Sequence, residues 1–447
     1  MGIPLTVFEY YMLADDRPAY PMNIFIRFRF RGQIDAALFR RSVAGATARH
    51  RLFGSKVTRL SRRKSVWEWC DTPTDIRTVS SEDTGLFNES GYIRAEPLDL
   101  YSAPGFRVYL IESPGNQDTE SRTDVVFQIH HSIADGVGIL AFLSDLWVIY
   151  NAGMDGICDE SLLTPIDPDA FARRGKYKYS LFQLYGNAWY NIRSSTRFLF
   201  TKIMSMVPFV PPGNDELPPM FPMIRTCVLT KEETAAYLKK AKVEQVTLND
   251  LALRDSFLAI ADWKKRHGTA DMPGKLRVAV PMDLRDEGHR NLAAANVVTM
   301  AFVDAAIETC DAPALLLRNV HDEMELIKKR GQRYILDVML KRGKLFTGDL
   351  AWYLKAQKCR STFCLSNLGR MFANTSLEKT EEGLVKMESL TLESLDAIPP
   401  IRPGTMVSCF LGTYAGRIGL TIRCDERFLT VPDADELLKL LCARMTQ

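Results

Sequence analysis

Strand-like and helix-like patterns alternate along both halves of this 447-residue chain. In 23–31, apolar side chains recur at every second position, which predicts a strand, and 35–50 has the apolar spacing of a helix. The first half also predicts strands at 106–111 and 124–129 and a mostly buried helix at 136–150. The second half predicts strands at 224–229, 276–281, 296–302, 361–366, 407–411 and 418–422, and helices after 230, over 248–268, 312–329 and 434–444. This mixture favours an α/β fold with two domains of similar size.

A proline-rich stretch separates the two halves. Its prolines stand at 165, 168, 208, 211, 212, 218, 219 and 222, where neither periodicity continues. We therefore predict an N-terminal domain over 1–180, a crossover over 181–223 and a C-terminal domain over 224–447. A threonine three residues before an acidic residue forms a capping box, which predicts helix starts at Thr230 and Thr247.

An unusual basic stretch begins shortly before the crossover and continues into it. Between 173 and 204 there are seven Lys or Arg residues and no acidic residue, with aromatic and aliphatic residues interleaved from Trp189 to Met204. A basic amphipathic helix of this kind can lie in a membrane interface. The alternative is a helix that covers the domain junction and leaves its basic face in water.

Composition excludes several classes of protein. Lys and Arg total 57 against 54 acidic residues, a net charge of +3, which does not favour nucleic-acid binding. Nine scattered cysteines include no CxxC pair, so we expect neither a zinc site nor a disulfide scaffold, but free thiols in a reducing cytoplasm. The N-terminus lacks the pattern of a signal peptide, and no run of 18 apolar residues is present.

One segment carries the pattern of a catalytic site, His130-His131-Ser132-Ile133-Ala134-Asp135-Gly136. It lies between a predicted strand and a predicted helix, a junction that presents side chains from a rigid scaffold. A neutral imidazole can take a proton from a hydroxyl or an amine near neutral pH. Asp135 could brace the loop, and Gly136 permits a tight turn. The alternative is a core histidine with a helix-capping aspartate. The other four histidines lie apart, and we expect them to be exposed to solvent.

This segment resembles the motif of the HHxxxDG acyltransferase superfamily, which includes chloramphenicol acetyltransferase, condensation domains of peptide synthetases and wax ester synthase/diacylglycerol acyltransferases. Five other segments fall in the family's order: 48–52, 96–110, 247–250, 280–285 and 366–369. The resemblance implies two chloramphenicol-acetyltransferase-like α/β sandwich domains that meet at a tunnel. The chain has no DFGWG segment, so the plant branch is not favoured, and no GGxS segment of a carrier domain.

The resemblance also assigns roles to residues. His131 would be the general base that deprotonates the acceptor, with His130 and Gly136 completing the catalytic motif. Asp135 would pair with Arg285 from the second domain and hold the loop. Ser366, Asn367, a backbone N–H near Gly369, or Asn249 would stabilise the oxyanion or contact the substrate, and the sequence does not choose among them. No metal ion and no bound cofactor is expected.

Three functions remain open at this stage. The first is a cytoplasmic O-acyltransferase, peripheral to the membrane or free of it, that uses acyl-CoA as co-substrate and a hydrophobic alcohol or lipid as acceptor. The second is a stand-alone condensation-type domain that takes its acyl group from a carrier protein and forms an ester or an amide. The third is a catalytically idle relative that binds a lipid or a partner protein. Charge near one end of the tunnel would distinguish the first two.

Overall fold

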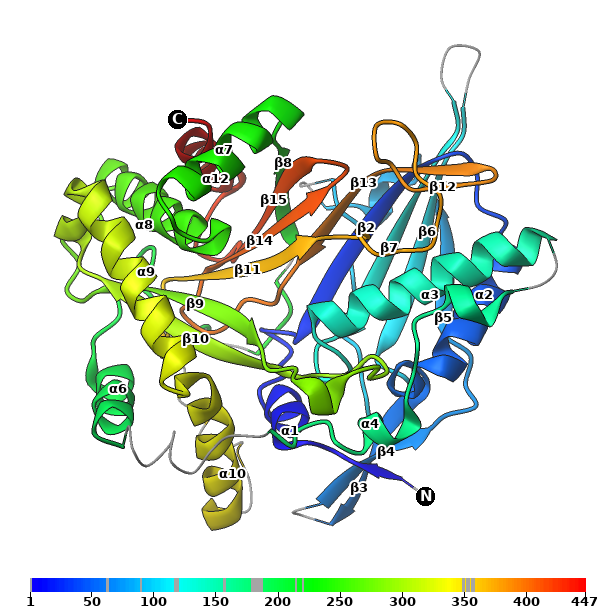
Figure 1. Ribbon diagram of the computed structural model, residues 1–447, viewed down its shortest axis with the longest axis horizontal. Helices are drawn as coiled ribbons and strands as arrows, with labels where there is room; N and C mark the ends of the chain where they lie inside the picture. The colour runs from blue at the N-terminus through cyan, green and yellow to red at the C-terminus, as the bar shows by residue number, and fades with distance from the viewer. Residues whose placement is uncertain are drawn as a thin grey trace.

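The computed structural model describes residues 2–447 apart from 62–63, 89–90, 116–119, 156–157, 178–187, 214, 219–220, 348–349, 351–353 and 355–357. Two six-stranded sheets, each covered by helices, lie next to each other and define two lobes (Figure 1). The sequence prediction of a two-lobed α/β fold is confirmed.

The sheet of the first lobe has the strand order β12-β13-β2-β7-β6-β5. Its strands are β2 (Asn23–Arg31), β5 (Asp75–Ser80), β6 (Phe106–Ser113), β7 (Arg122–His130), β12 (Lys386–Met387) and β13 (Leu390–Ile398). Helices α2 (Ala36–Arg49) and α3 (Gly136–Asp155) pack against each other and over this sheet. Phe28 of β2 stacks on Trp147 of α3 with ring centroids 5.9 Å apart, so the alternate residues of β2 build the core predicted for them.

A smaller sheet of three strands lies at the edge of this lobe. Its order is β1 (Ile3–Pro4), β4 (Lys64–Trp69) and β3 (Ser55–Ser61). These strands were not predicted. Short helices connect the elements: η1 (Arg51–Gly54), η2 (Thr84–Leu86), η3 (Glu160–Leu162), η4 (Glu287–His289), η5 (Ile307–Asp311), η6 (Gln332–Tyr334) and α4 (Pro168–Phe171).

The sheet of the second lobe has the order β10-β9-β11-β14-β15-β8. Its strands are β8 (Met223–Val228), β9 (Leu276–Asp283), β10 (Val298–Ala305), β11 (Phe363–Arg370), β14 (Val407–Tyr414) and β15 (Arg417–Cys424). Helices α7 (Lys231–Val243), α8 (Leu248–Arg266), α9 (Pro313–Lys329) and α12 (Val431–Thr446) belong to this lobe. The predicted capping boxes at Thr230 and Thr247 begin α7 and α8, and a third at Thr430 begins α12.

Strand β13 departs from the predicted division of the chain. It follows β11 in sequence, but it pairs antiparallel with β2, from Thr391 opposite Arg31 to Ile398 opposite Phe25 (Figure 1). A buried ion pair accompanies this pairing, because Arg27 donates to Asp396 over 2.8 Å. Residues 386–398 therefore lie in the first lobe, whereas the division at residue 224 placed them in the second.

Three further helices are α1 (Val7–Ala14), α6 (Ala188–Phe200) and α10 (Ile335–Thr347). Helices α1 and α10 pack against each other, whereas α6 packs on edge strand β10 of the second lobe (Figure 1). Helix α6 carries part of the predicted basic stretch, whose residues 178–187 lie outside the described structure. Residues 136–153 of α3 are long and apolar enough to cross a bilayer by composition, and half of this window is buried in the protein. Since Phe142, Leu143 and Leu146 are fully buried, α3 is a core helix.

Candidate active site

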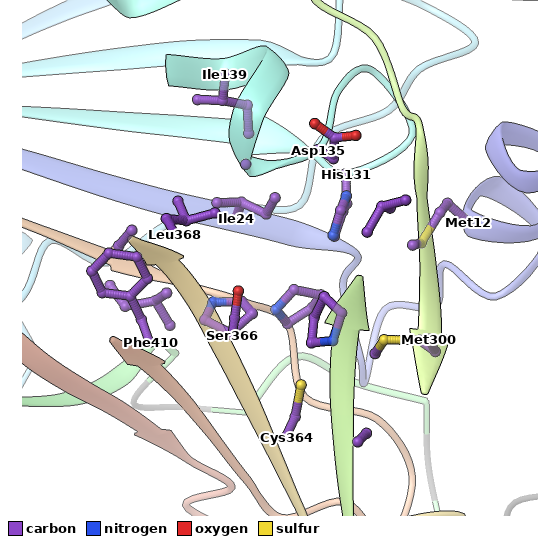
Figure 2. A pocket seen from close by; sticks show the side chains of 18 of the residues that line it. Met12, Ile24, His131, Asp135, Ile139, Met300, Cys364, Ser366, Leu368 and Phe410 are labelled. Carbon is purple, nitrogen blue, oxygen red and sulfur yellow. The ribbon is translucent and has the colours of Figure 1, made fainter. Parts of the chain in front are cut away.

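His131 stands at the junction of the two sheets. It follows directly after the last residue of β7, and its ring points into a cavity of about 190 Å³ (Figure 2). The walls come from both lobes and are mostly apolar; they include Met12, Met22, Ile24, Ile26, Ile139, Met300, Leu368, Ala397, Ile398 and Phe410. A single imidazole therefore faces a space that suits apolar groups.

The environment of His131 favours its neutral form. Burial lowers the pKa of His131 below its usual 6.5, and neighbouring His130 acts in the same direction. Asp135 and the carbonyl groups of His131 and Ala134 act against this shift, but they do not reverse it. Nδ1 is buried and has no well-aligned hydrogen-bond partner among the described residues. A neutral imidazole at neutral pH is the form that can accept a proton from a substrate.

The loop that carries His131 is anchored to the second lobe by Asp135. One carboxylate oxygen accepts hydrogen bonds from Arg285 Nη1 (3.0 Å) and from the N–H of Val297 (2.6 Å). The other accepts from Arg285 Nη2 (2.9 Å) and from the N–H of Gly138 (2.9 Å). The structure thus brings together the two partners that the resemblance implied. Four donors occupy both oxygens of Asp135, so this carboxylate holds the loop in place.

Asn296 holds His131 from the other lobe and was not identified from the sequence. Its side chain is buried, and its Nδ2 donates to the carbonyl oxygen of His131 over 2.7 Å. The residue precedes β10, next to the segment that binds Asp135. Nothing local in the sequence distinguishes Asn296 from any other asparagine before a strand, because its partner lies 165 positions away.

His130 does not line the cavity. Its ring is fully buried, Nδ1 lies 2.7 Å from Ser132 Oγ, and Nε2 lies 3.5 Å from Asp16 Oδ2. Burial alone would raise the pKa of Asp16, but the neighbouring His130 side chain, the N–H of Met22 and Arg402 lower it below its usual value. These contacts give His130 a positioning role: it ties the end of β7 to the loop that follows α1.

The structure separates the four candidates for the oxyanion or substrate site. Ser366 and Asn367 of β11 line the cavity with His131 (Ser366 is labelled in Figure 2). Gly369 is not among the lining residues; its backbone has a φ of +65°, and its N–H donates to Asn367 Oδ1 over 2.8 Å. Because that oxygen is occupied, the Nδ2 group of Asn367 is the one left to donate toward the cavity. Asn249 lies in the first turn of α8, away from the lining.

The expectation that the other histidines are exposed is wrong for His50 and His289. His50 is fully buried: its Nδ1 accepts from the N–H of Ala294 (2.9 Å) and its Nε2 lies 3.1 Å from Asp145 Oδ2. This arrangement joins α2, α3 and the segment before β10. A lone histidine becomes buried when distant residues supply both partners, and the sequence does not show them.

All nine cysteines are free thiols, and four of them are buried. In the described part of the chain, no group of three or more His, Cys, Asp or Glu side chains could hold a metal ion.

No family model matches the chain. Among curated proteins it is 24% identical to the uncharacterized protein Rv2305 of Mycobacterium tuberculosis, over 82% of this chain and 83% of that one. It is 27% identical to a linear gramicidin synthase of Brevibacillus parabrevis over 168 residues, which are 36% of this chain and only 2% of the synthase.

Solved structures resemble the whole chain. The trichothecene 15-O-acetyltransferase TRI3 of Fusarium sporotrichioides matches with a TM-score of 0.69 at 13% identity, over 99% of this chain and 94% of that one. The first condensation domain of the CDA synthetase matches with a TM-score of 0.66 at 14% identity, over 100% and 97%. The chain therefore has the two-lobed fold of condensation domains and chloramphenicol-acetyltransferase-like acetyltransferases, as the sequence motif indicated.

Proposed function

We propose that this protein transfers an acyl group from an acyl thioester to the hydroxyl of a hydrophobic alcohol or lipid, with His131 as general base. One observation carries the proposal: an imidazole whose neutral form is favoured, on a loop anchored from both lobes, opens onto an apolar cavity in an acyltransferase-type fold. The cavity matches an apolar substrate because moving apolar surface out of water is favourable.

The residues of the site fit a balanced reaction. His131 takes the proton of the acceptor hydroxyl group, and the oxygen of that hydroxyl group attacks the thioester carbonyl carbon. The tetrahedral intermediate carries its negative charge beside Ser366 and Asn367, whose hydroxyl and amide groups can donate to it. When the C–S bond breaks, the imidazolium returns the proton to the thiolate, so that an ester and a free thiol leave. Asp135 and Asn296 contact no reacting atom in this scheme; they keep His131 in place.

Acyl-CoA is the donor that we propose. The alternative donor is an acyl group on a separate carrier protein, which the fold shared with condensation domains supports equally well. In a third proposal the protein only binds a lipid or a partner. The nine free thiols agree with a cytoplasmic location, which remains part of the proposal.

Release of free CoA thiol tests the function. Acetyl-, octanoyl- and palmitoyl-CoA would each be mixed with a panel of alcohols and amines, and the wild type compared with His131→Ala. His321→Ala is the matched control, because that side chain is 32% exposed and contacts Asp250 outside the cavity. We expect acceptor-dependent release that only His131→Ala abolishes. No release from folded protein with any donor would refute the CoA-dependent reaction, and release with a carrier-bound donor alone would establish the alternative.

A further inference from the structure

Helix α6 turns an apolar face to the solvent. Its Phe198 packs on Phe302 of edge strand β10, with ring centroids 4.6 Å apart, and its Arg197 binds Asp304 of the same strand. At 100° per residue, Trp189 and Phe200 lie on the side opposite Phe198. These two aromatic side chains are 79% and 83% exposed. Large exposed aromatic residues on a single helix face indicate a surface that contacts a partner.

Helix α10 also packs on β10 and presents a second exposed apolar group. Leu345 is 75% exposed, and Arg342, one turn before it, is exposed as well. The other side of α10 is occupied, since Leu340 is buried in a cluster with residues of α1 and Lys344 lies over the ring of Tyr10 in α1. Both helices lie at the lower edge of the view in Figure 1.

The charge of these segments is strongly positive. Residues 328–360 contain ten Lys or Arg residues and two acidic ones, although the whole chain carries only +3. Residues 188–204 contain three basic residues and no acidic one. Arg193 and Arg342 are exposed, and within the described part of the chain neither forms an ion pair. Basic residues between exposed Trp, Phe and Leu side chains are typical of protein surfaces that bind anionic bilayers.

The position of this surface suits a hydrophobic substrate. Leu340 of α10 packs in one cluster with Met12 of α1 and Val298 of β10. Met12, Val298 and Met300 are lining residues of the cavity that holds His131. Helix α10 is therefore attached to the side of the cavity formed by α1 and β10, and α6 packs farther along β10, at Phe302.

We propose that the α6–α10 surface, made of Trp189, Ile192, Arg193, Leu199, Phe200, Arg342 and Leu345, binds an anionic lipid bilayer. The aromatic and aliphatic side chains enter the interface, and the arginines contact lipid phosphates. This surface holds the protein where an apolar acceptor or acyl group dissolved in the bilayer is concentrated. Binding does not require the proposed acyl transfer, so either can fail without the other.

Co-sedimentation with vesicles tests the proposal. Vesicles of phosphatidylcholine with and without phosphatidylglycerol would be mixed with the wild type, the double variant Trp189→Glu/Phe200→Glu, and Val243→Glu. Val243, 71% exposed at the end of α7, is the matched control. We expect binding to the anionic vesicles that weakens with salt, falls at least about tenfold in the double variant and is unchanged in Val243→Glu. Because a charge could disturb α6, Trp189→Phe is the second variant: it keeps the apolar face and lowers the quenching of tryptophan fluorescence by brominated lipid.

Two outcomes would overturn the proposal. One is equal sedimentation of the wild type and the folded double variant. The other is a wild-type dimer in solution that the double variant abolishes without any vesicle binding, since this would assign the surface to a second copy of the chain.

Discussion

Removing Arg285 should destabilise the junction of the two lobes far more than an ordinary surface ion pair would. Asp135 is only 3% exposed, and Arg285 supplies two of the four hydrogen bonds to its carboxylate, at 2.9 and 3.0 Å. In Arg285→Ala the carboxylate stays buried with only the N–H groups of Gly138 and Val297 as donors. Loss of one partner of a buried pair typically costs about 3–5 kcal/mol of unfolding free energy. Because two donors remain, we expect about 3 kcal/mol.

Asp283→Ala is the matched control for this variant. Asp283 also binds Arg285, over 3.0 Å, but its side chain is 47% exposed. Exposed ion pairs contribute about 0–1 kcal/mol, so this variant should unfold close to the wild type. Arg285→Ala removes the buried contact to Asp135 and the exposed contact to Asp283, whereas Asp283→Ala removes only the exposed one, so the difference between the two variants reports the buried contact.

Urea unfolding followed by circular dichroism and by tryptophan fluorescence measures both variants. Asp135→Ala and the double variant with Arg285→Ala complete a double-mutant cycle. The double variant should lose less stability than the sum of the single variants, because the second substitution removes a charge that the first left unpaired. A loss below about 1 kcal/mol in Arg285→Ala, equal to that in Asp283→Ala, would refute the claim that this pair fixes the loop.

Three further predictions concern the site. The acidic limb of kcat/KM against pH should lie below pH 6.5, because the lowered pKa of His131 keeps the base neutral to a lower pH; a limb above pH 6.5 would contradict this. Asn296→Ala should lower kcat about 10–10²-fold with little change in KM, because the carbonyl group of His131 loses its donor; an unchanged kcat in the thiol-release assay would argue against a positioning role. Gly138→Ala should lower the melting temperature, because the new Cβ atom would lie 2.8 Å from the backbone oxygen of Ala295. Gly136→Ala should lower it less, because the nearest atoms to its Cβ belong to the movable Leu368 side chain, and equal melting temperatures of the two variants would contradict this prediction.

The sequence predicted the elements with strong local signals. Apolar alternation marked β2, and capping boxes marked α7 and α8, because these patterns depend on neighbours within a few residues. The position of His131 between a strand and a helix was also readable, since the motif and the periodicities lie in one segment. The partnership of Asp135 with Arg285 came from the resemblance, as no local pattern connects residues 150 positions apart.

What the sequence did not show depends on contacts between distant segments. The stretch Leu390–Ile398 was not predicted as a strand, and it includes Glu393 and Asp396. Asp396 is tolerated inside the sheet because Arg27, 369 positions earlier, pairs with it. His50, Asn296 and Asp16 are similar cases: each acquires its role from a partner that folding supplies.

Strand β13 has a consequence for the order in which the protein can be completed. As the chain is synthesised from its N-terminus, β2 can pair with β7, but the opposite side of β2 stays open until residues 386–398 emerge. An open strand edge is a template for pairing with other chains. A fragment that ends before residue 386 should therefore keep an unprotected sheet and aggregate. The first lobe becomes complete only after most of the second has been made, so the first lobe is not an independent folding unit.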